Sequence, residues 1–263
     1  MKTKGGFKLQ SIFKGDKFTN NIGLCYEVIE YFSATKRTGG VKIKFDISGY
    51  EGIYSATEVR AGEVKDHCSP TVCGVGYFGV GEFICSLNGI KTREYLLWHN
   101  MLKRCYEDNH PTYDEKYVIE DWHNFQNFAK WCHSEEGFNL KSNGKYYNLD
   151  KDLLYPNNKV YSPDTCCFIP HSLNTALVGK SLRTGLLCGV YKNRNGEFVT
   201  HVDVENGKVK AVKHKDVYSA NMTYKLEKLR KIKECAELHK EYLSDKVLEA
   251  IEFLNLDERI IYN

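Results

Sequence analysis

This 263-residue chain contains ten cysteines, a number that raises the possibility of disulfides or of a zinc site. Zinc ribbons and fingers place two thiolates on one metal through a C-x-x-C pair, and the sequence contains no such pair. The N-terminal stretch MKTKGGFKLQ lacks the apolar segment of an export signal, so we expect a reducing compartment with free thiols. Most cysteines are therefore predicted to be small buried side chains. Only for Cys166–Cys167, close to His171, does a chemical role stay open.

A second chemical signal is a G-x-G-x-x-G pattern at Gly74, Gly76 and Gly79. In a dinucleotide-binding fold this pattern opens a helix whose N-terminal amides face the pyrophosphate. The residues that follow, GVGEFICSLNGIKT, are typical of strand and turn instead. We therefore interpret residues 71–83 as a β-rich connector and not as a nucleotide site.

Any site must be held in place by secondary structure. Residues 1–90 are predicted to form an all-β region. Short runs of β-formers at Cys25–Tyr31 and Val41–Ile47, separated by Gly, Asn and Thr turns, predict a small barrel or curled sheet. Apolar residues at helical spacing then predict helices over Glu94–Tyr106 and Trp122–His133, the second capped by Asp121. Their aromatic side chains are expected in the core.

Residues 148–177 predict two strands followed by a helix. We expect a strand over Asn148–Leu154, a second one over Val160–Ile169 interrupted at Ser162–Asp164, and a helix over Ser172–Val178 that opens after Pro170. This is the order of a ββα-metal hairpin.

From about residue 92 to 178 the chain resembles the HNH endonuclease-like proteins that are common in bacteriophage genomes. The stretches that carry the resemblance are Trp98–Tyr106 (WHNMLKRCY), Trp122–Phe128 (WHNFQNF), Leu149–Asp152 (LDKD), Tyr161–Cys166 (YSPDTC) and Asn174. In that family one divalent metal, Mg²⁺ or Mn²⁺, polarises the scissile phosphate while a histidine deprotonates the attacking water. The resemblance implies that Asp150 and Asn174 occupy the two metal-ligand positions, Lys151 the general-base position and Thr165 the position of the asparagine that orients the base.

Two of these positions depart from the family pattern. A lysine is protonated at neutral pH and cannot take a proton from water, and the neighbouring Asp150 and Asp152 favour its charged form at position 151. Thr165 has no imidazole to orient. His171, three residues before Asn174, is the alternative base, although it also fits an exposed histidine at a helix start. We interpret the site as degenerate, with weak or absent cleavage.

The C-terminal region predicts three strands joined by Asn-Gly turns, within LLCGVYK, EFVTHVDV and VKAVKHK, followed by a helix over Ser219–Tyr242 and a short acidic helix over Asp245–Asn255. This order resembles the ethylene-response-factor type of DNA-binding domain, which implies that the sheet enters the major groove. The implied DNA-contacting residues are Lys192, Arg194, Thr200, Lys208, Lys210 and Lys213. The alternative is that these lysines are ordinary solvated side chains.

Composition bounds the remaining alternatives. The net charge is only +3, but residues 181–240 hold 13 Lys and Arg against 7 Asp and Glu. Such a basic stretch is a plausible footprint for a phosphate backbone. No apolar run is long enough to span a bilayer, so we expect no membrane partner and a cytoplasmic location. The resemblance to phage proteins implies that the cell is an infected bacterial host.

We thus expect an α+β, multidomain chain with three parts: a small β-barrel-like module (residues 1–90), a degenerate ββα-metal module (91–180), and a three-stranded sheet packed on a helix (181–263). Three functions stay open at this point. The first is a protein that binds double-stranded DNA with little or no nuclease activity. The second is an active metal-dependent homing or nicking endonuclease. The third is an inhibitor that binds a host enzyme or defence protein.

Overall fold

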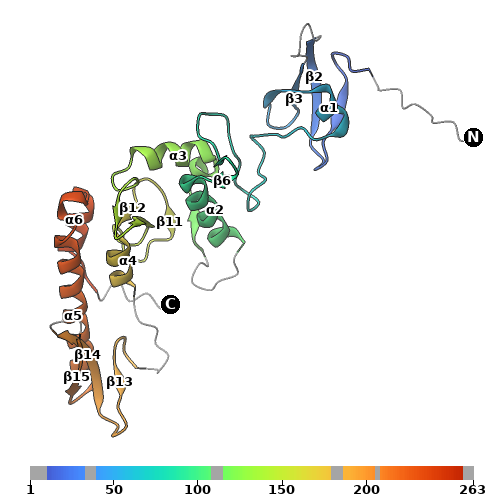
Figure 1. Cartoon of the computed structure of the whole chain (residues 1–263). Helices are drawn as coiled ribbons and strands as arrows, with labels where there is room; N and C mark the ends of the chain where they lie inside the picture. Colours follow the sequence, from blue (N-terminus) through green and yellow to red (C-terminus); the bar gives the residue numbers. More distant parts are fainter. Residues whose placement is uncertain (1–10, 33–39, 108–114, 179–185, 205–207, 257–263) are drawn as a thin grey trace, which may run out of the picture. The chain divides into compact units, whose positions relative to one another are not determined.

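The computed structural model describes residues 11–32, 40–107, 115–178, 186–204 and 208–256 (Figure 1). The chain divides into two compact units, residues 1–82 and residues 83–263. The expected α+β class is confirmed, since helices alternate with several small sheets. Within the described ranges, no helix combines the length and the apolar character that a membrane span requires.

The first unit is a four-stranded antiparallel sheet with one short helix. Its elements are β1 (Lys17–Thr19), β2 (Cys25–Phe32), β3 (Gly40–Phe45), β4 (Glu51–Tyr54) and α1 (Ala56–Ala61). The strands pair in chain order. Over the described residues β1 and β4 are not paired, so the sheet is open and the predicted barrel does not close. The core of this unit includes Tyr26, Val28, Val41, Ile43, Phe45 and Val59.

The opposite face of this sheet carries alternating charges. Lys17 stands opposite Glu27, Glu27 opposite Lys44, and Lys44 opposite Glu51 across the four strands. Lys42 adds an ion pair to Glu51 at 2.8 Å. Opposite charges in neighbouring positions stabilise a solvated sheet face, and they leave little net charge there for a polyanion to contact.

The second unit begins with helices and short hairpins. Its first elements are β5 (Ser86–Leu87), β6 (Ile90–Lys91), α2 (Arg93–Tyr106), β7 (Tyr117–Val118), η2 (Glu120–His123), α3 (Phe125–Ser134), β8 (Lys141–Ser142) and β9 (Lys145–Tyr146). They are followed by β10 (Asn148–Asp150), β11 (Val160–Tyr161), β12 (Cys167–Ile169), α4 (His171–Leu177), β13 (Tyr191–Lys192), β14 (Phe198–Val204), β15 (Lys208–His214), α5 (Val217–Glu237), η4 (Lys240–Tyr242) and α6 (Asp245–Glu252). The predicted modules 91–180 and 181–263 both belong to this unit.

The aromatic stripes of α2 and α3 form the core of the unit, as predicted. Trp98, Trp122 and Phe128 are fully buried, and the indole N–H of Trp98 donates to the Trp122 carbonyl at 2.7 Å. The predicted cap Asp121 lies instead in the short helix η2. Asn124 caps α3, since its side chain accepts from the backbone N–H of Gln126 at 3.0 Å.

A partly buried arginine attaches α2 to the segment that leads into β10. The guanidinium of Arg93 donates to the backbone carbonyls of Phe138 and Tyr147, the latter at 2.5 Å. It also lies over the ring of Tyr146, 4.6 Å from the centroid. Five N–H donors in a planar group make arginine well suited to this double role.

The glycine-rich segment is a tight turn. The backbone N–H of Thr71 donates to the carbonyl of Gly76 at 2.9 Å, and Gly74 has a φ of 74°. The next element is the hairpin strand β5 and not a helix, which agrees with the interpretation of this segment as a β-rich connector.

Candidate functional site

The predicted order of two strands and a helix is present, with shorter strands than expected. β10 and β12 pair antiparallel, with Asp150 opposite Cys167, and α4 follows directly and contacts β10. The expected second strand is two strands, because β11 turns away to pair in parallel with β7 and only β12 lies beside β10. This small unit, which we call the ββα unit (β10, β12 and α4), holds the candidate site residues 150, 151, 165, 171 and 174.

Asp150 ends β10 and shapes the turn after it. One of its carboxylate oxygens, Oδ1, accepts from the backbone N–H groups of Asp152 at 3.0 Å and Leu153 at 2.6 Å. An aspartate that binds the backbone two and three residues ahead stabilises a turn, and so the predicted strand to Leu154 stops at Asp150. One carboxylate oxygen of this candidate metal ligand is therefore already bound to backbone N–H groups.

Lys151, at the implied general-base position, is buried with only 4% of its surface exposed. Its ammonium group forms an ion pair with Asp152 and donates to the backbone carbonyl of Asn158 at 2.7 Å. The ring of Tyr161 lies beneath it, with its centroid 5.7 Å away. The Nζ atom of Lys151 is thus occupied by a carboxylate and a backbone carbonyl inside the turn, which argues against contact with an attacking water.

Asn158 is a central residue of this turn that the sequence analysis missed. Its side-chain amide donates to the carbonyls of Lys151 at 2.8 Å and Val160 at 2.6 Å, and it accepts from the Val160 N–H at 3.1 Å. The only sequence signal was its place in the Pro-Asn-Asn turn, where asparagine commonly bonds to nearby backbone.

Thr165 closes the loop between β11 and β12. Its hydroxyl donates to the Val160 carbonyl at 2.8 Å and accepts from the Ser162 N–H at 3.1 Å. These bonds are those of a loop-stabilising threonine. In this arrangement the Thr165 hydroxyl is committed to the loop backbone, which argues against a role in orienting a base.

His171 is the exposed first residue of α4, and Asn174 is half-buried one turn later. Among the described residues, no group of three or more His, Cys, Asp or Glu side chains is arranged to hold a metal ion. Asp150 and Asn174 are thus the chain's two candidate metal ligands in the ββα unit. A metal held by them would need further ligands from water or from a bound phosphate.

The two adjacent cysteines belong to the core. Both are buried, and burial raises the pKa of Cys166 to about 12 and the pKa of Cys167 well above its ordinary value. Neither is a thiolate near neutral pH, so neither is prepared to attack a substrate or bind a metal. All ten cysteines fall in described ranges, and no two of them form a disulfide. Only Cys132, Cys166 and Cys167 are buried, so the prediction that most cysteines are buried was wrong.

The C-terminal sheet forms as predicted, with strand order β13-β14-β15 and α5 packed against β14 and β15 (Figure 1). Asp216 caps α5 by accepting from the Ser219 N–H at 2.8 Å. Gly189, with a φ of 74°, lies directly against the ring of Tyr224, where a Cβ atom would collide. This contact holds the chain before β13 onto the helix.

Thr200 is corrected from a DNA-contacting residue to a core residue. It is fully buried, and its hydroxyl donates to the Gly189 carbonyl at 3.0 Å. It lies on the more buried face of β14, where the opposite residue on β15 is the partly buried Val212. A small polar side chain on such a face bonds to the backbone and does not reach solvent.

The predicted lysines of the sheet do not share one face. Lys210 stands opposite Val202 and Lys213 opposite Val199, so the two side chains point to opposite faces. Lys213 forms an ion pair with Glu197 at 2.9 Å. The side chain of Lys208 lies outside the described part of the structure.

Three of the predicted cations have no acidic partner among the described residues. They are Lys192, whose ammonium lies over the Phe198 ring at 5.2 Å, Arg194 in the turn before β14, and Lys210 on β15. All three are exposed. Lys192 and Lys210 share one face of the sheet by register, since Phe198 and Val202 are their cross-strand partners on β14. This is the face that also carries the buried Thr200, so the two lysines lie at its exposed ends.

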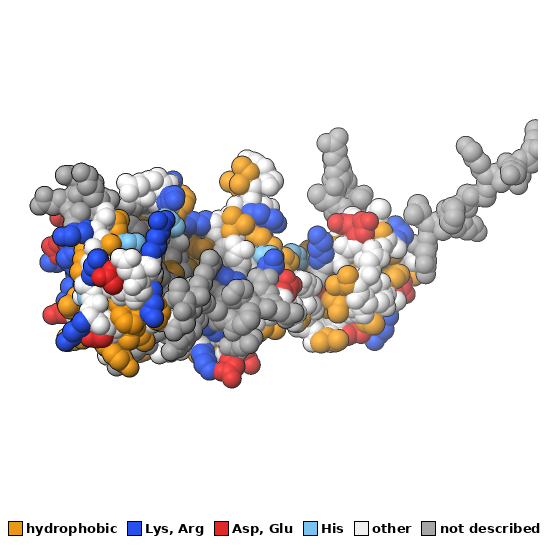
Figure 2. All heavy atoms as spheres, turned by 90° about the horizontal axis from the view of Figure 1, so that it is seen from below, with side chains coloured by type: hydrophobic (Ala, Val, Ile, Leu, Met, Phe, Trp, Pro, Cys, Tyr) orange, Lys and Arg blue, Asp and Glu red, His pale blue; other side chains and the backbone are white. Residues whose placement is uncertain are grey.

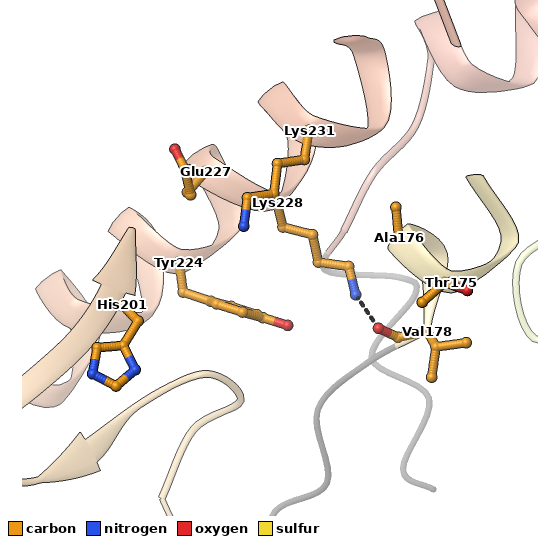
Figure 3. Close-up of a pocket in the computed structure, with 8 residues that line it drawn as sticks. All are labelled: Thr175, Ala176, Val178, His201, Tyr224, Glu227, Lys228 and Lys231. Atoms are coloured by element: carbon orange, nitrogen blue, oxygen red, sulfur yellow. Dashed lines mark hydrogen bonds between the residues drawn. The ribbon is translucent and has the colours of Figure 1, made fainter. Parts of the chain in front are cut away.

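A small pocket lies where the ββα unit meets the C-terminal sheet (Figure 3). Its lining side chains are Thr175, Ala176, Val178, His201, Tyr224, Glu227, Lys228 and Lys231. Lys228 donates to the last carbonyls of α4, at 3.2 Å to Leu177 and 2.8 Å to Val178, and Lys231 pairs with Asp203. Cations favour the C-terminal end of a helix, so Lys228 joins α5 to the end of α4, while Lys231 joins α5 to β14.

In the view of Figure 2, the Lys and Arg side chains lie scattered among acidic and apolar ones. On the face drawn there, charge does not single out a binding surface, and the site is argued from individual residues. The chain matches no protein-family model, no curated protein and no solved structure.

Proposed function

We propose that this chain is a phage-type DNA-binding protein built on an HNH endonuclease-like scaffold, with weak or absent nuclease activity. The observation that carries the proposal is the state of Lys151. The ββα unit holds this lysine at the position where the resemblance implies a base, buried and bound to Asp152 and the Asn158 carbonyl.

The rest of the unit supports a scaffold more than a catalyst. Thr165 and one oxygen of Asp150 bind the local backbone. His171 is exposed on α4, and no described group prepares it to act as a base. If the unit did cleave DNA, Asp150 and Asn174 would hold Mg²⁺ or Mn²⁺, and the metal would polarise a phosphate there.

Duplex DNA is the proposed partner of the C-terminal sheet. Lys192, Arg194 and Lys210 are exposed cations that have no acidic partner within the described part of the chain, which is what a phosphate contact requires. Thr200 no longer belongs to this set because it is buried, and Lys213 is already paired with Glu197. We therefore expect mostly phosphate contacts and modest sequence specificity.

The test is a titration of duplex DNA with the full chain at several salt concentrations. Each phosphate contact should contribute about 0.9 to the slope of log K against log salt concentration. Replacing Lys192, Arg194 and Lys210 together by glutamine should lower that slope by roughly 2 to 3. The matched control is Lys213→Gln, which should change the slope little. A wild-type slope near zero would refute DNA binding and favour a protein partner.

Plasmid nicking decides between the binding protein and the active endonuclease. We expect unchanged supercoiled plasmid with wild-type protein in Mg²⁺ or Mn²⁺. Nicking by the wild type that disappears in Asp150→Ala would replace the proposed function by a metal-dependent endonuclease.

A further inference from the structure

Helix α5 carries a row of large apolar side chains on its exposed side. Tyr218, Met222 and Leu226 follow one another at four-residue spacing, which places them on one side of the helix. Their exposed fractions are 75%, 59% and 63%. Isolated exposed apolar residues are ordinary, but consecutive ones on one helix face form a patch that a partner can cover. We call Tyr218, Met222 and Leu226 the apolar row.

The same side of α5 is covered farther along the helix. Met222, Leu229 and Ala236 follow at seven-residue spacing and so lie on one line, and Ala236 is buried while Leu229 is half-buried. Helix α6 packs against α5, and Figure 1 draws it beside the C-terminal end of that helix. Val247 and Ile251 form the buried face of α6.

The helix that packs on α5 is acidic. The exposed side chains of α6 include Asp245, Glu249 and Glu252. The C-terminal half of α5 thus already accommodates an acidic amphipathic helix, and the apolar row continues the same side of α5 beyond it.

Lysines border the apolar row. Lys225 follows Met222 by three residues and Lys233 follows Leu226 by seven, so both lie on its side of the helix. The exposed Lys215 lies just before the helix. Two acidic residues of this region are engaged elsewhere: Glu227 accepts from the backbone N–H of Asp203 on β14 at 3.1 Å, and Asp216 caps the start of α5. The surface around the row is therefore basic.

We propose that the apolar row docks an acidic amphipathic helix of a partner protein. Apolar side chains one turn apart on the partner would pack against Met222 and Leu226, while its carboxylates would face the lysines. A second copy of α5 does not fit this surface, because lysines would then face lysines.

This surface is separate from the proposed DNA contacts. Lys192, Arg194 and Lys210 lie on or before the strands of the sheet, and none of them belongs to the apolar row. A variant that loses partner binding should therefore keep its affinity for DNA, and failure of either proposal can be recognised without the other.

The experiment uses a designed fluorescent helical peptide with leucines at i, i+3, i+4 and i+7 and glutamates at the remaining positions. A matched peptide carries lysines in place of the glutamates. Binding to the full chain is followed by fluorescence anisotropy at low and high salt. We expect binding of the acidic peptide, weakened by salt and weakened about tenfold or more by the double substitution Met222→Gln and Leu226→Gln.

The control variant is Leu238→Gln, which removes an equally exposed apolar side chain (81%) outside the row and should bind like wild type. Circular dichroism of each variant checks that α5 is still folded. The proposal is overturned if the acidic peptide does not bind, if the lysine peptide binds equally well, or if the double variant binds like wild type. It is also overturned if the row instead mediates self-association by sedimentation, or adsorption to phosphatidylserine vesicles.

Discussion

Replacing Lys151 by methionine separates a structural lysine from a catalytic one. Methionine keeps most of the buried side-chain volume and removes the ammonium group. The substitution therefore leaves the Asn158 carbonyl and the Asp152 carboxylate without their partner. If Lys151 has a structural role, the variant should be less stable than wild type and should neither gain nor lose nicking activity.

The size of the effect follows from the two lost contacts. A hydrogen bond from a charged donor to a buried carbonyl contributes about 1.5–3 kcal/mol. The ion pair adds only about 0.5–1 kcal/mol, because the Asp152 side chain is 27% exposed and partly screened by water. We expect a loss of about 2–4 kcal/mol, which for a unit spanning Phe83–Asn263 lowers the melting temperature by roughly 5–12 °C.

The assay is thermal denaturation followed by circular dichroism, together with plasmid nicking on the same preparations. The control is Lys145→Met on the exposed strand β9, which should stay within about 0.5 kcal/mol of wild type. In a double-mutant cycle, Lys151→Met and Asp152→Asn together should destabilise less than the sum of the two single changes. A Lys151→Met protein that melts like wild type but loses a wild-type nicking activity would refute the structural role.

Three further predictions concern neighbouring features. Asn158→Ala should cost about 2–3 kcal/mol, since it removes bonds to Lys151 and Val160, and urea denaturation measures this; an unchanged midpoint would contradict it. Gly189→Ala should destabilise the protein by about 2–4 kcal/mol, because an alanine there has an unfavourable positive φ and collides with Tyr224; a lower melting temperature measures this. The control is Gly144→Ala in the β8–β9 turn, where φ is also positive but a Cβ has space, so that it tests the effect of φ alone. Acid should weaken the C-terminal sheet, because the Asn193 and Lys213 side chains lower the pKa of Glu197 and the Ser219 N–H lowers the pKa of Asp216. Carboxyl pKa values that are lower in the folded state stabilise the fold at pH values above the unfolded pKa near 4, and this stability is lost as the pH falls through the folded pKa values. The difference in melting temperature between wild type and the Glu197→Gln/Asp216→Asn variant should therefore vanish near pH 2.

Local patterns in the sequence predicted the elements well. The Asn-Gly turn between β13 and β14 and the apolar spacing of α2 and α5 each depend on residues a few positions apart. Such signals do not require knowledge of the rest of the fold. The bounds of α2 lie within one residue of those predicted, whereas α5 ends at Glu237 and not at Tyr242, and β13 covers only Tyr191–Lys192.

Pairings between distant segments could not be read in the same way. β11 joins β7, about forty residues earlier, and so it leaves the strand that was expected to continue to Ile169. The burial of Thr200 likewise depends on how the sheet packs against α5 and the segment around Gly189, since the alternation of a strand gives two faces but not which one is covered.

The contacts of Lys151 could not be predicted from the sequence. The resemblance implied a site at Asp150 and Lys151, and that site stays a prediction. Lys151 is held by the backbone carbonyl of Asn158, seven residues later. Every residue has a backbone carbonyl, so the residue types in the sequence do not indicate which one binds the lysine. The sequence alone therefore did not decide whether Lys151 could act on a substrate. In the structure its ammonium group is already bound to Asp152 and to the Asn158 carbonyl.

The alternating charges on the sheet of the first unit bear on how salt effects in this protein should be interpreted. The cross-strand series from Lys17 to Glu51 pairs each cation with a carboxylate, so this face offers few cations that could displace the counterions condensed on a polyanion. Raising the ionic strength should weaken these pairs only slightly and should not detach any ligand from the face. If the affinity of the whole chain for a polyanion depends steeply on salt concentration, the dependence can be assigned to cations outside this sheet face.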